Sequence, residues 1–440
     1  MKVLKFGGTS VGSVENMCNV KNIINDGKKK IVVLSAMSGT TNILVSIANN
    51  ILNDKPNEAI EKINKLHETY FSTIDNLLYN ESLNAEVKKY VTEIFNFLVE
   101  CTYQEYSLHL ENQIVAQGEL LSTYMFHNYL AQEGIKSTLL PALSFMRIDK
   151  NKEPDLFYIK QDFESVFQQT PKATIYITQG FICLDEEGNI SNLQRGGSDY
   201  TATIIGAVIK AEEVEIWTDI DGMHNNDPRY VENTKPISNL SFDEAAELAY
   251  FGAKILHPQT VTPVRADNIP VRLKNTMNPE AYGTLINDNH IENGVKAIAA
   301  KDNITAIKIK SGRMLLAHGF LRKVFEIFEV YETAIDMITT SEVAISLTID
   351  DDKNLDKILH ELEKFSVVEV DKKQTIVCLV GHSIVNHHET YKLFQILQDV
   401  KIRMISYGGS NNNISLLINA DDKITTLGKL NHYLFELVTL

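Results

Sequence analysis

Cysteine is scarce in this chain of 440 residues. The four cysteines, Cys18, Cys101, Cys183 and Cys378, are scattered and form no CxxC pair. So few cysteines at such spacings predict neither a disulfide framework nor a zinc site. We therefore expect them to be reduced and mostly buried.

Long apolar runs are also missing. The longest candidate, residues 202–209, includes Thr203 and Gly206, and it is far shorter than the roughly 18 residues that a membrane span needs. The apolar run at the start of the chain is too short for a signal peptide. The sequence thus predicts a cytoplasmic protein with no membrane partner.

Positive charge is in deficit. Acidic residues number 57 and basic residues 42, which gives a net charge of −15. Proteins that bind nucleic acid usually present a basic face, so we expect no nucleic-acid partner. The length predicts two or three domains, at roughly 150 residues each.

The first 40 or so residues read as a unit of a parallel α/β sheet. A strand predicted over 3–6 ends in the turn Gly7-Gly8-Thr9-Ser10, and a second, over 30–36, ends near Gly39-Thr40-Thr41. An amphipathic stretch over 14–25 lies between them. We expect strand, glycine-rich turn, helix and strand in that order.

Glycine is absent between Gly39 and Gly118, and apolar residues recur there at helical spacing. This pattern predicts about 80 residues of consecutive helices. The α/β alternation then returns. We expect strands over 174–178, 214–218, 271–273 and 283–286, and helices over 200–210, 242–251 and 258–267. This domain should end near residue 295.

The remaining residues, 296–440, contain an internal repeat. The segment 334–347 echoes 401–416, with Met337 matching Met404 and Ser346 matching Ser415. Helical patterns flank each copy, over 319–331, 355–365, 389–398 and 423–437. Two small α+β modules in tandem are predicted, near 313–375 and 376–440, and the strand 303–311 could complete the second.

Four segments could carry chemistry. Gly7-Gly8 after a strand would admit an anion, and Lys5 could neutralise a phosphoryl group; on its own, an ordinary βα turn is favoured by roughly two to one. The segment 194–199 offers Arg195 to a carboxylate, or is simply a helix capped by Ser198. Thr218 and Asp219 end a strand, where ligands gather in parallel sheets. Arg229 alone would be a surface charge more often than a phosphate ligand, and Lys254 could simply complement the dipole at a helix C-terminus.

Together, and in this order, these segments resemble the aspartokinases over nearly the whole chain. The resemblance rests on Lys5–Ser10, residues 194–202, residues 217–219 with 227–229, and residues 251–258. The two repeats are similar to the pair of ACT domains of that family. The resemblance implies an amino acid kinase fold, a mostly parallel sheet between helical layers, followed by two ferredoxin-like ACT domains. It also implies transfer of the ATP γ-phosphoryl group to the β-carboxylate of L-aspartate.

The resemblance assigns roles to individual residues. Lys5 and Asp199 would be catalytic. Substrate-binding residues would be Thr41, Glu119, Arg195, Gly196, Gly197 and Ser198. Besides Lys5, the ATP-binding residues would be Phe6, Gly7, Gly8, Thr218, Asp219, His224, Arg229, Lys254 and Ile255. His224 departs from the tyrosine usual in the family. Mg²⁺ is expected with ATP, with no protein ligand assigned and no tightly bound prosthetic group.

The regulatory half resembles lysine-sensitive members of the family. An L-lysine effector would contact Met314, Phe320, Leu321, Asp336, Thr340, Ser341 and Glu342, although Ala317 and His318 depart from the family pattern. The ACT pair would also join a homodimer or higher homo-oligomer. Alternatively, the pair is retained for dimerisation alone.

Two other functions stay open at this point. A kinase of the same fold could act on another amino-acid carboxylate, such as glutamate or acetylglutamate. A non-catalytic amino-acid sensor should have lost Lys5, Glu119, Arg195 or Asp199, and all four are present. The length leaves no room for a fused homoserine dehydrogenase.

Overall fold

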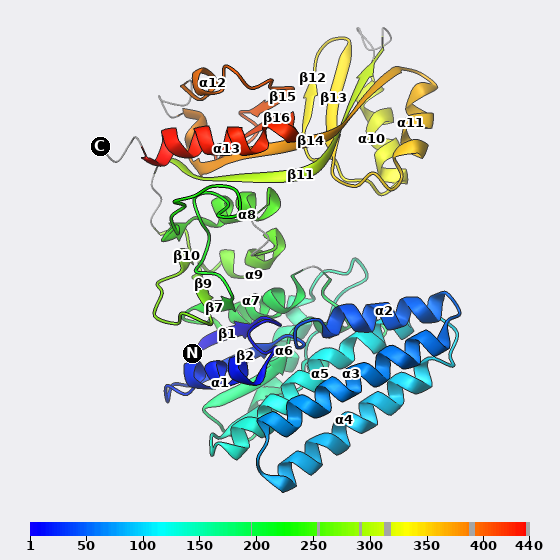
Figure 1. Cartoon of the computed structure of the whole chain (residues 1–440), viewed down its shortest axis with the longest axis vertical. Helices are drawn as coiled ribbons and strands as arrows, with labels where there is room; N and C mark the ends of the chain where they lie inside the picture. Colours follow the sequence, from blue (N-terminus) through cyan, green and yellow to red (C-terminus); the bar gives the residue numbers. More distant parts are fainter. Residues whose placement is uncertain (195, 253–255, 290–292, 312–317, 387–391, 437–440) are drawn as a thin grey trace. The chain divides into compact units, whose positions relative to one another are not determined.

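The computed structural model describes residues 1–194, 196–252, 256–289, 293–311, 318–386 and 392–436. The chain divides into two compact units, coloured along the sequence in Figure 1. The first contains Met1–Met223, Ser238–Phe242 and Leu256–Asp288, and the second contains His224–Ile237, Asp243–Ile255 and Asn289–Leu440. Two segments that precede the expected boundary at 295 therefore belong to the second unit.

An eight-stranded sheet forms the centre of the first unit, in the order β3-β4-β2-β1-β7-β9-β10-β8. All neighbouring pairs are parallel except β9 with β10. Every residue of β2 and β4 is buried, as expected for strands covered on both faces. The strands are β1 (Lys2–Phe6), β2 (Lys30–Leu34), β3 (Ser137–Leu140), β4 (Ile175–Gln179), β7 (Val214–Thr218), β8 (Asn239–Leu240), β9 (Val271–Asn275) and β10 (Thr284–Ile286).

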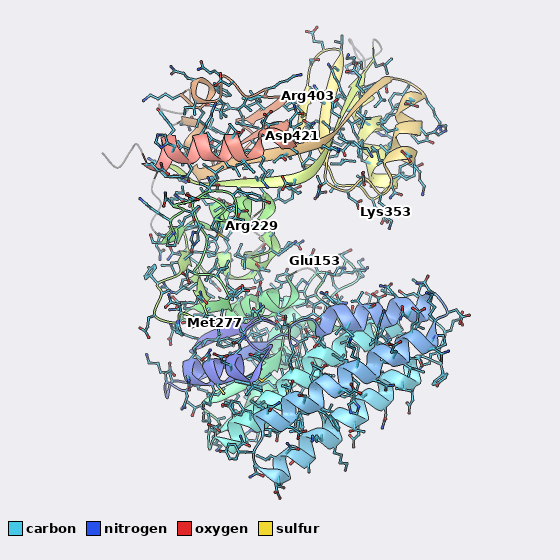
Figure 2. The ribbon with its side chains drawn as sticks, in the orientation of Figure 1. Glu153, Arg229, Met277, Lys353, Arg403 and Asp421 are labelled. Atoms are coloured by element: carbon cyan, nitrogen blue, oxygen red, sulfur yellow. The ribbon has the colours of Figure 1, made fainter. Side chains whose placement is uncertain are left out.

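The glycine-free stretch forms four consecutive helices, as predicted. They are α2 (Thr40–Leu52), α3 (Pro56–Leu77), α4 (Glu81–Cys101) and α5 (Leu108–Gln132). They pack side by side, with α2 and α5 also in contact (Figure 1). Their apolar residues share one core with the sheet and with α1 (Val14–Ile24). Side chains on their outer faces are exposed (Figure 2).

Helices α6 (Leu156–Gln169), α7 (Gly197–Ile209) and α9 (Thr262–Arg265) and the β5–β6 hairpin (Ile182–Leu184, Ile190–Asn192) complete this unit. The helix expected over 258–267 is a 3₁₀ turn, Pro258–Val261, followed by the single turn α9. Pro263 interrupts the helix because it has no N–H to donate to the carbonyl four residues earlier.

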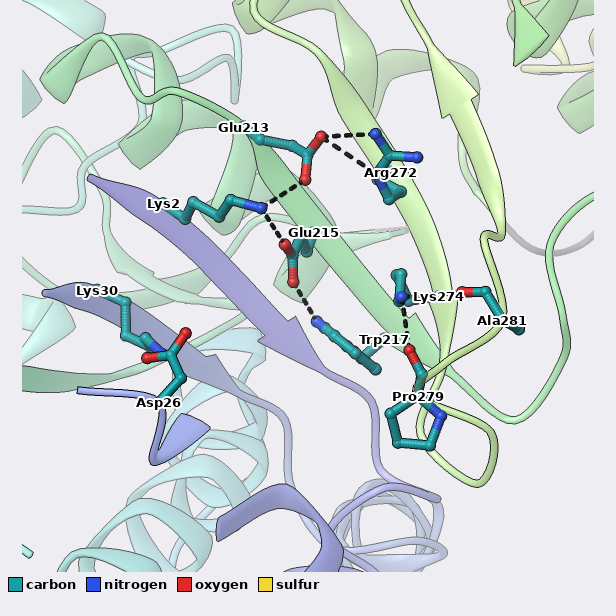
Figure 3. A network of polar contacts seen from close by, with 10 residues as sticks. All are labelled: Lys2, Asp26, Lys30, Glu213, Glu215, Trp217, Arg272, Lys274, Pro279 and Ala281. Atoms are coloured by element: carbon teal, nitrogen blue, oxygen red, sulfur yellow. Dashed lines mark hydrogen bonds and ion pairs between the residues drawn. The ribbon is translucent and has the colours of Figure 1, made fainter. Parts of the chain in front are cut away.

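A network of charged side chains crosses the amino-terminal ends of the central strands (Figure 3). Lys2 Nζ donates to Glu213 Oε1 at 2.9 Å and to Glu215 Oε1 at 2.7 Å. Glu215 Oε2 accepts from Trp217 Nε1 at 2.9 Å, and Arg272 Nη2 donates to Glu213 Oε2 at 3.0 Å. These contacts join β1, β7 and β9 at the end of the sheet opposite the glycine-rich turns.

The second unit contains one six-stranded sheet in the order β12-β13-β11-β14-β16-β15. Its strands are β11 (Gly294–Lys310), β12 (Ile338–Thr340), β13 (Ala344–Ile349), β14 (Val367–His382), β15 (Met404–Tyr407) and β16 (Asn413–Asn419), all antiparallel to their neighbours. The helices are α8 (Phe242–Tyr250), α10 (Phe320–Val330), α11 (Leu355–Glu363), α12 (Lys392–Ile396) and α13 (Lys423–Asn431), followed by a π-helical turn, His432–Glu436.

The two repeats share this sheet. The long strands β11 and β14 pair along their lengths, and each contributes half to one repeat and half to the other. Residues 305–310 of β11 pair with β13, so the strand 303–311 lies beside the first repeat and not the second. The reason is that the interrupted register near Lys301 and Ile304 divides β11 between the repeats.

No helix in the described parts of the chain is long and apolar enough to cross a membrane.

The packing of the four-helix layer predicts that loss of a buried side chain lowers the stability of the fold. Leu98 on α4 is fully buried, so Leu98→Ala should lower the free energy of unfolding by about 2–5 kcal/mol. Leu52→Ala is the matched control because Leu52, at the end of α2, is 53% exposed. Urea unfolding followed by circular dichroism measures both. Equal shifts in the two variants would contradict this packing.

Candidate active site

A lysine and an aspartate meet at the carboxyl end of β1. Lys5 Nζ lies 2.6 Å from Asp199 Oδ1, and each side chain is 12% exposed. Lys5 is on β1 and Asp199 is in the first turn of α7. The pair is thus partly buried, where a charge interaction is stronger than in bulk water.

Two strand-end turns lie against each other beside this pair. Gly7 N donates to the Trp217 carbonyl at the end of β7, at 3.2 Å. Ser38 N, in the turn after β2, donates to the Gly8 carbonyl at 3.1 Å. The carboxyl ends of neighbouring parallel strands therefore form one polar edge. This is the edge at which Lys5 lies.

Glu119 is buried within α5 next to the same edge. Its Oε1 accepts from Ala36 N at 3.2 Å, whereas Oε2 is buried without a hydrogen-bond partner among the described residues. Burial raises the pKa of the Glu119 carboxyl to about 8. A buried carboxylate with an unused oxygen is suited to a cationic group of a ligand, which would compensate the cost of its desolvation.

The start of α7 is shaped by glycines. Gly196 has φ +68°, and a Cβ there would meet the side chains of His257 and Thr260 at 2.7 and 2.9 Å. Ser198 packs directly against Gly180, the residue after β4. These contacts bring the start of α7 to the carboxyl edge of the sheet. Arg195, the predicted partner of a carboxylate, lies outside the described residues.

Two helix N-termini contribute backbone donors. Neither α2, preceded by Gly39, nor α7, preceded by Gly196, has a side-chain cap within the described residues. Thr41 lies in the first turn of α2, and Gly197 and Ser198 lie in the first turn of α7. Uncapped N–H groups at a helix start attract anions. The arrangement can therefore hold carboxylate or phosphate groups.

The predicted nucleotide residues are divided between the two units. In the first unit, Thr218 ends β7 and its Oγ1 lies 3.1 Å from the Asp219 carboxylate. The Phe6 side chain is fully buried and stacks on Trp217, so Phe6 can reach a ligand only through its backbone.

In the second unit, His224 Nδ1 lies 2.9 Å from Thr234 Oγ1. The exposed Arg229 guanidinium forms a fork with the Asp227 carboxylate, including Nη2 to Oδ2 at 2.6 Å. Lys254 and Ile255 lie outside the described residues.

The predicted effector residues that the structure describes fall into three groups. Phe320 starts α10 and packs edge-to-face against Phe365, while Leu321 is exposed. Thr340, Ser341 and Glu342 lie exposed at the β12–β13 turn. Asp336 does not face solvent: its side chain contacts Lys301 and Tyr250. Met314 lies outside the described residues.

One part of the site was not predicted from the sequence. Gly180 and Phe181 follow β4 and support the start of α7, with Phe181 N donating to Thr201 Oγ1 at 3.0 Å. Phe181 also has φ +67°, a conformation that is uncommon for a non-glycine residue. The glycine directly after a buried strand was the available signal, since it matches the turns after β1 and β2.

Comparisons with known proteins agree with this geometry. The model of the amino acid kinase family matches residues 1–275, and that of an ACT domain matches residues 377–434. The chain is 35% identical to lysine-sensitive aspartokinase 3 of Escherichia coli (strain K12), over 99% of both proteins.

Solved structures of an aspartokinase are also similar to this chain over its whole length. The structure of E. coli aspartokinase III with aspartate and ADP, described as the R-state, superposes with a TM-score of 0.85 at 33% identity, over 99% of this chain and 100% of that one. The same enzyme with lysine and aspartate, described as the T-state, gives 0.81 at 33% identity, over 99% of both chains.

The buried Glu119 carboxyl predicts a pH effect on stability. Its pKa is about 8 in the folded chain, against an ordinary value of 4.5. The folded state therefore holds a proton that the unfolded state releases, and stability falls as the pH rises from about 5 through 8. Glu119→Gln removes this loss, so the variant should gain stability relative to the wild type between pH 5.5 and pH 8.5.

Urea unfolding of the ligand-free protein at the two pH values tests this. Glu133→Gln is the control because the Lys21 ammonium holds the pKa of Glu133 below its usual range. Its effect on stability should thus be constant across this interval. A Glu119→Gln difference that is also constant would show that Glu119 is ionised in the empty site.

Proposed function

This chain belongs to the aspartokinase family, and on that premise we propose that it transfers the γ-phosphoryl group of ATP to the β-carboxylate of L-aspartate. The product, 4-phospho-L-aspartate, begins the aspartate pathway to lysine, threonine and methionine. The observation that carries the proposal is the Lys5–Asp199 ion pair at the glycine-rich turn, with the buried Glu119 carboxyl at the same edge of the sheet.

The reaction requires little proton chemistry. The β-carboxylate of aspartate is already ionised at pH 7, so it attacks the γ-phosphorus without a general base. The protein must then align the two substrates and neutralise the charge that develops on the phosphoryl oxygens. Lys5 supplies the positive charge, Asp199 holds its ammonium in place, and Gly7 and Gly8 let the phosphoryl group approach the backbone.

Aspartate would be recognised at both of its charged ends. Its ammonium would lie against Glu119 Oε2, the buried oxygen with no described partner. Its α-carboxylate would pair with Arg195 and with the N–H groups of Gly196, Gly197 and Ser198, while Thr41 contributes from the start of α2. Binding of the ammonium favours the ionised form of Glu119, so aspartate would bind with release of a proton.

The family resemblance assigns ATP binding to two groups of residues. The first group is Thr218, Asp219 and the backbone of Phe6, and the second is His224, Arg229, Lys254 and Ile255. In the second group, Arg229 would exchange its Asp227 partner for a phosphate oxygen. Mg²⁺ would enter with ATP as part of the substrate, and we assign it no protein ligand.

We further propose that L-lysine inhibits the enzyme at the first repeat. Asp336 and Glu342 would meet its ammonium groups. The start of α10 at Phe320 and Leu321, which no side chain of the described residues caps, would meet its carboxylate. Pairing of two chains through these repeats, giving a homodimer or a higher homo-oligomer, is part of the same proposal.

Removal of the catalytic ammonium should abolish turnover. Lys5→Ala is expected to lower kcat at least about 100-fold, the loss typical when one donor to a developing negative charge is removed. An ATP-dependent hydroxamate assay with L-aspartate measures it. Lys2→Ala is the matched control, because Lys2 lies on the same strand at the opposite end and should retain most of the activity. Full activity in Lys5→Ala would reject this role.

Loss of the Glu119 charge should act mainly on aspartate binding. Removal of one hydrogen bond to a charged group costs about 1.5–3 kcal/mol, so Glu119→Gln should raise KM for aspartate about 10- to 100-fold. KM for ATP should stay within about twofold. The wild type should prefer aspartate over glutamate and acetylglutamate in the same assay. Product from glutamate but not from aspartate would make the substrate assignment wrong.

A further inference from the structure

A buried cluster of charges lies in the second unit, at the residue predicted to hold the effector. Lys301 Nζ, on β11, contacts Asp336 Oδ1 at 2.7 Å and Asp350 Oδ2 at 2.8 Å. The Asp336 side chain is 1% exposed. The carboxylate proposed for an effector ammonium is thus already occupied by an ammonium of the chain itself.

Tyr250, the last residue of α8, completes this cluster. Its hydroxyl donates to Asp336 Oδ1 at 2.7 Å, and its ring centroid lies 4.3 Å from Lys301 Nζ. Gly252, two residues later, lies against the Ala300 carbonyl on β11 so closely that no Cβ would fit. The segment that leads into the predicted ATP residues Lys254 and Ile255 is therefore held by β11 and by Asp336.

Asp336 retains one unused oxygen. Its Oδ2 is buried, and the described residues offer it no hydrogen-bond partner. Burial raises the pKa of Asp336, while the Lys301 ammonium and the Tyr250 hydroxyl oppose that rise. A buried carboxylate is costly without a paired cation. An ammonium that approached Oδ2 would therefore compete with Lys301 for the same negative charge.

The second repeat offers an internal comparison. Lys301 pairs with Ile376 and Ala306 pairs with Asp371, so Lys301 and Asp371 occupy equivalent positions on β11 and β14. Arg403, labelled in Figure 2, takes the place of Asp336 in the second repeat. Its Nη2 lies 2.7 Å from Asp371 Oδ2. The ion pair recurs with its charges exchanged. The first repeat, not the second, thus presents a buried carboxylate to an ammonium.

We propose that Lys301 is an intramolecular competitor of the effector at Asp336, and that Tyr250 is a positioning residue that transmits the outcome to the segment after α8. The inference rests on the proposed regulation by L-lysine. An effector ammonium at Asp336 displaces Lys301 Nζ and the Tyr250 hydroxyl. The end of α8 then loses its attachment to the effector site, and the chain that enters the ATP residues is no longer held by it.

The competition is tested by calorimetric titration of the full chain with L-lysine. Lys301→Met should tighten lysine binding about tenfold, because the fraction of chains with a free Asp336 rises. Arg403→Met removes the equivalent ion pair of the second repeat and should leave lysine binding unchanged. Lysine affinity that is unchanged or weaker in a folded Lys301→Met chain overturns the competition.

A second variant covers the case in which Lys301→Met does not fold. Asp350→Asn removes the other carboxylate that holds Lys301, from a side chain that is 39% exposed. Lys301 then has Asp336 as its one described carboxylate partner and loses the carboxylate that would hold it after displacement, so lysine should bind more weakly. Unchanged or tighter lysine binding in this variant overturns the competition. Circular dichroism establishes that each variant is folded.

The role of Tyr250 is tested by separating binding from inhibition. Tyr250→Phe should bind lysine within about threefold of the wild type, yet need at least about tenfold more lysine for half-inhibition of aspartate phosphorylation. Without lysine, its KM for ATP should rise while kcat at saturating ATP is retained. Tyr407→Phe is the control, since Tyr407 OH donates only to the Val385 carbonyl in the contacts described. Unchanged inhibition in Tyr250→Phe overturns its role.

The outcomes also separate this inference from the proposed activity. A wild-type chain that phosphorylates aspartate but binds no lysine overturns the inference and leaves the kinase assignment intact. A chain that shows no aspartate-dependent turnover overturns the kinase assignment, and the titrations of Lys301→Met and Asp350→Asn still decide the competition at Asp336.

Discussion

The ion pair between Lys5 and Asp199 is the interaction on which the candidate site depends. It joins the end of β1 to the first turn of α7, two elements almost 200 residues apart in the chain. Parallel pairing brings the carboxyl ends of β1, β2, β4 and β7 to one edge, and α7 packs across β1. Because both side chains are largely buried, the loss of either partner would leave an uncompensated charge. The pair therefore fixes the position of the ammonium before any substrate is bound.

Glu119, unlike Lys5 and Asp199, carries a charge that no partner in the described fold compensates. Ionisation of its carboxyl in the empty fold is unfavourable, which is why its pKa rises to about 8. An apolar residue would pack on α5 at less cost, so the carboxyl conflicts with the helix around it. The conflict is resolved if the ammonium group of a substrate supplies the missing charge. Substrate binding and the ionisation of Glu119 are then linked, and specificity follows from a charge that the fold leaves uncompensated.

The regulatory half is organised by sharing of strands. β11 and β14 each serve both repeats, so the two repeats are joined by continuous strands. The segments His224–Ile237 and Asp243–Ile255 are grouped with this sheet although they precede it in the sequence. Contacts such as Lys296 with the buried Glu244, at 3.0 Å, and Tyr250 with Asp336, at 2.7 Å, attach them. Segments assigned to the nucleotide are thus structurally part of the regulatory unit.

The sequence by itself determined the kind of most elements and the motifs of the site. Strand, glycine turn and helix patterns are local, and hydrophobic periodicity records which face is buried. Thus the helices from Thr40 to Gln132, the parallel strands, the repeat and the candidate residues Lys5, Glu119 and Asp199 could be read from it. The sequence did not reveal three features: the helix ends near Pro263, the burial of Phe6 and the division of β11 between the repeats. It also did not reveal the pairing of Asp336 with Lys301 and Tyr250. These depend on which distant segments meet, and only tertiary packing decides which buried charge finds which partner.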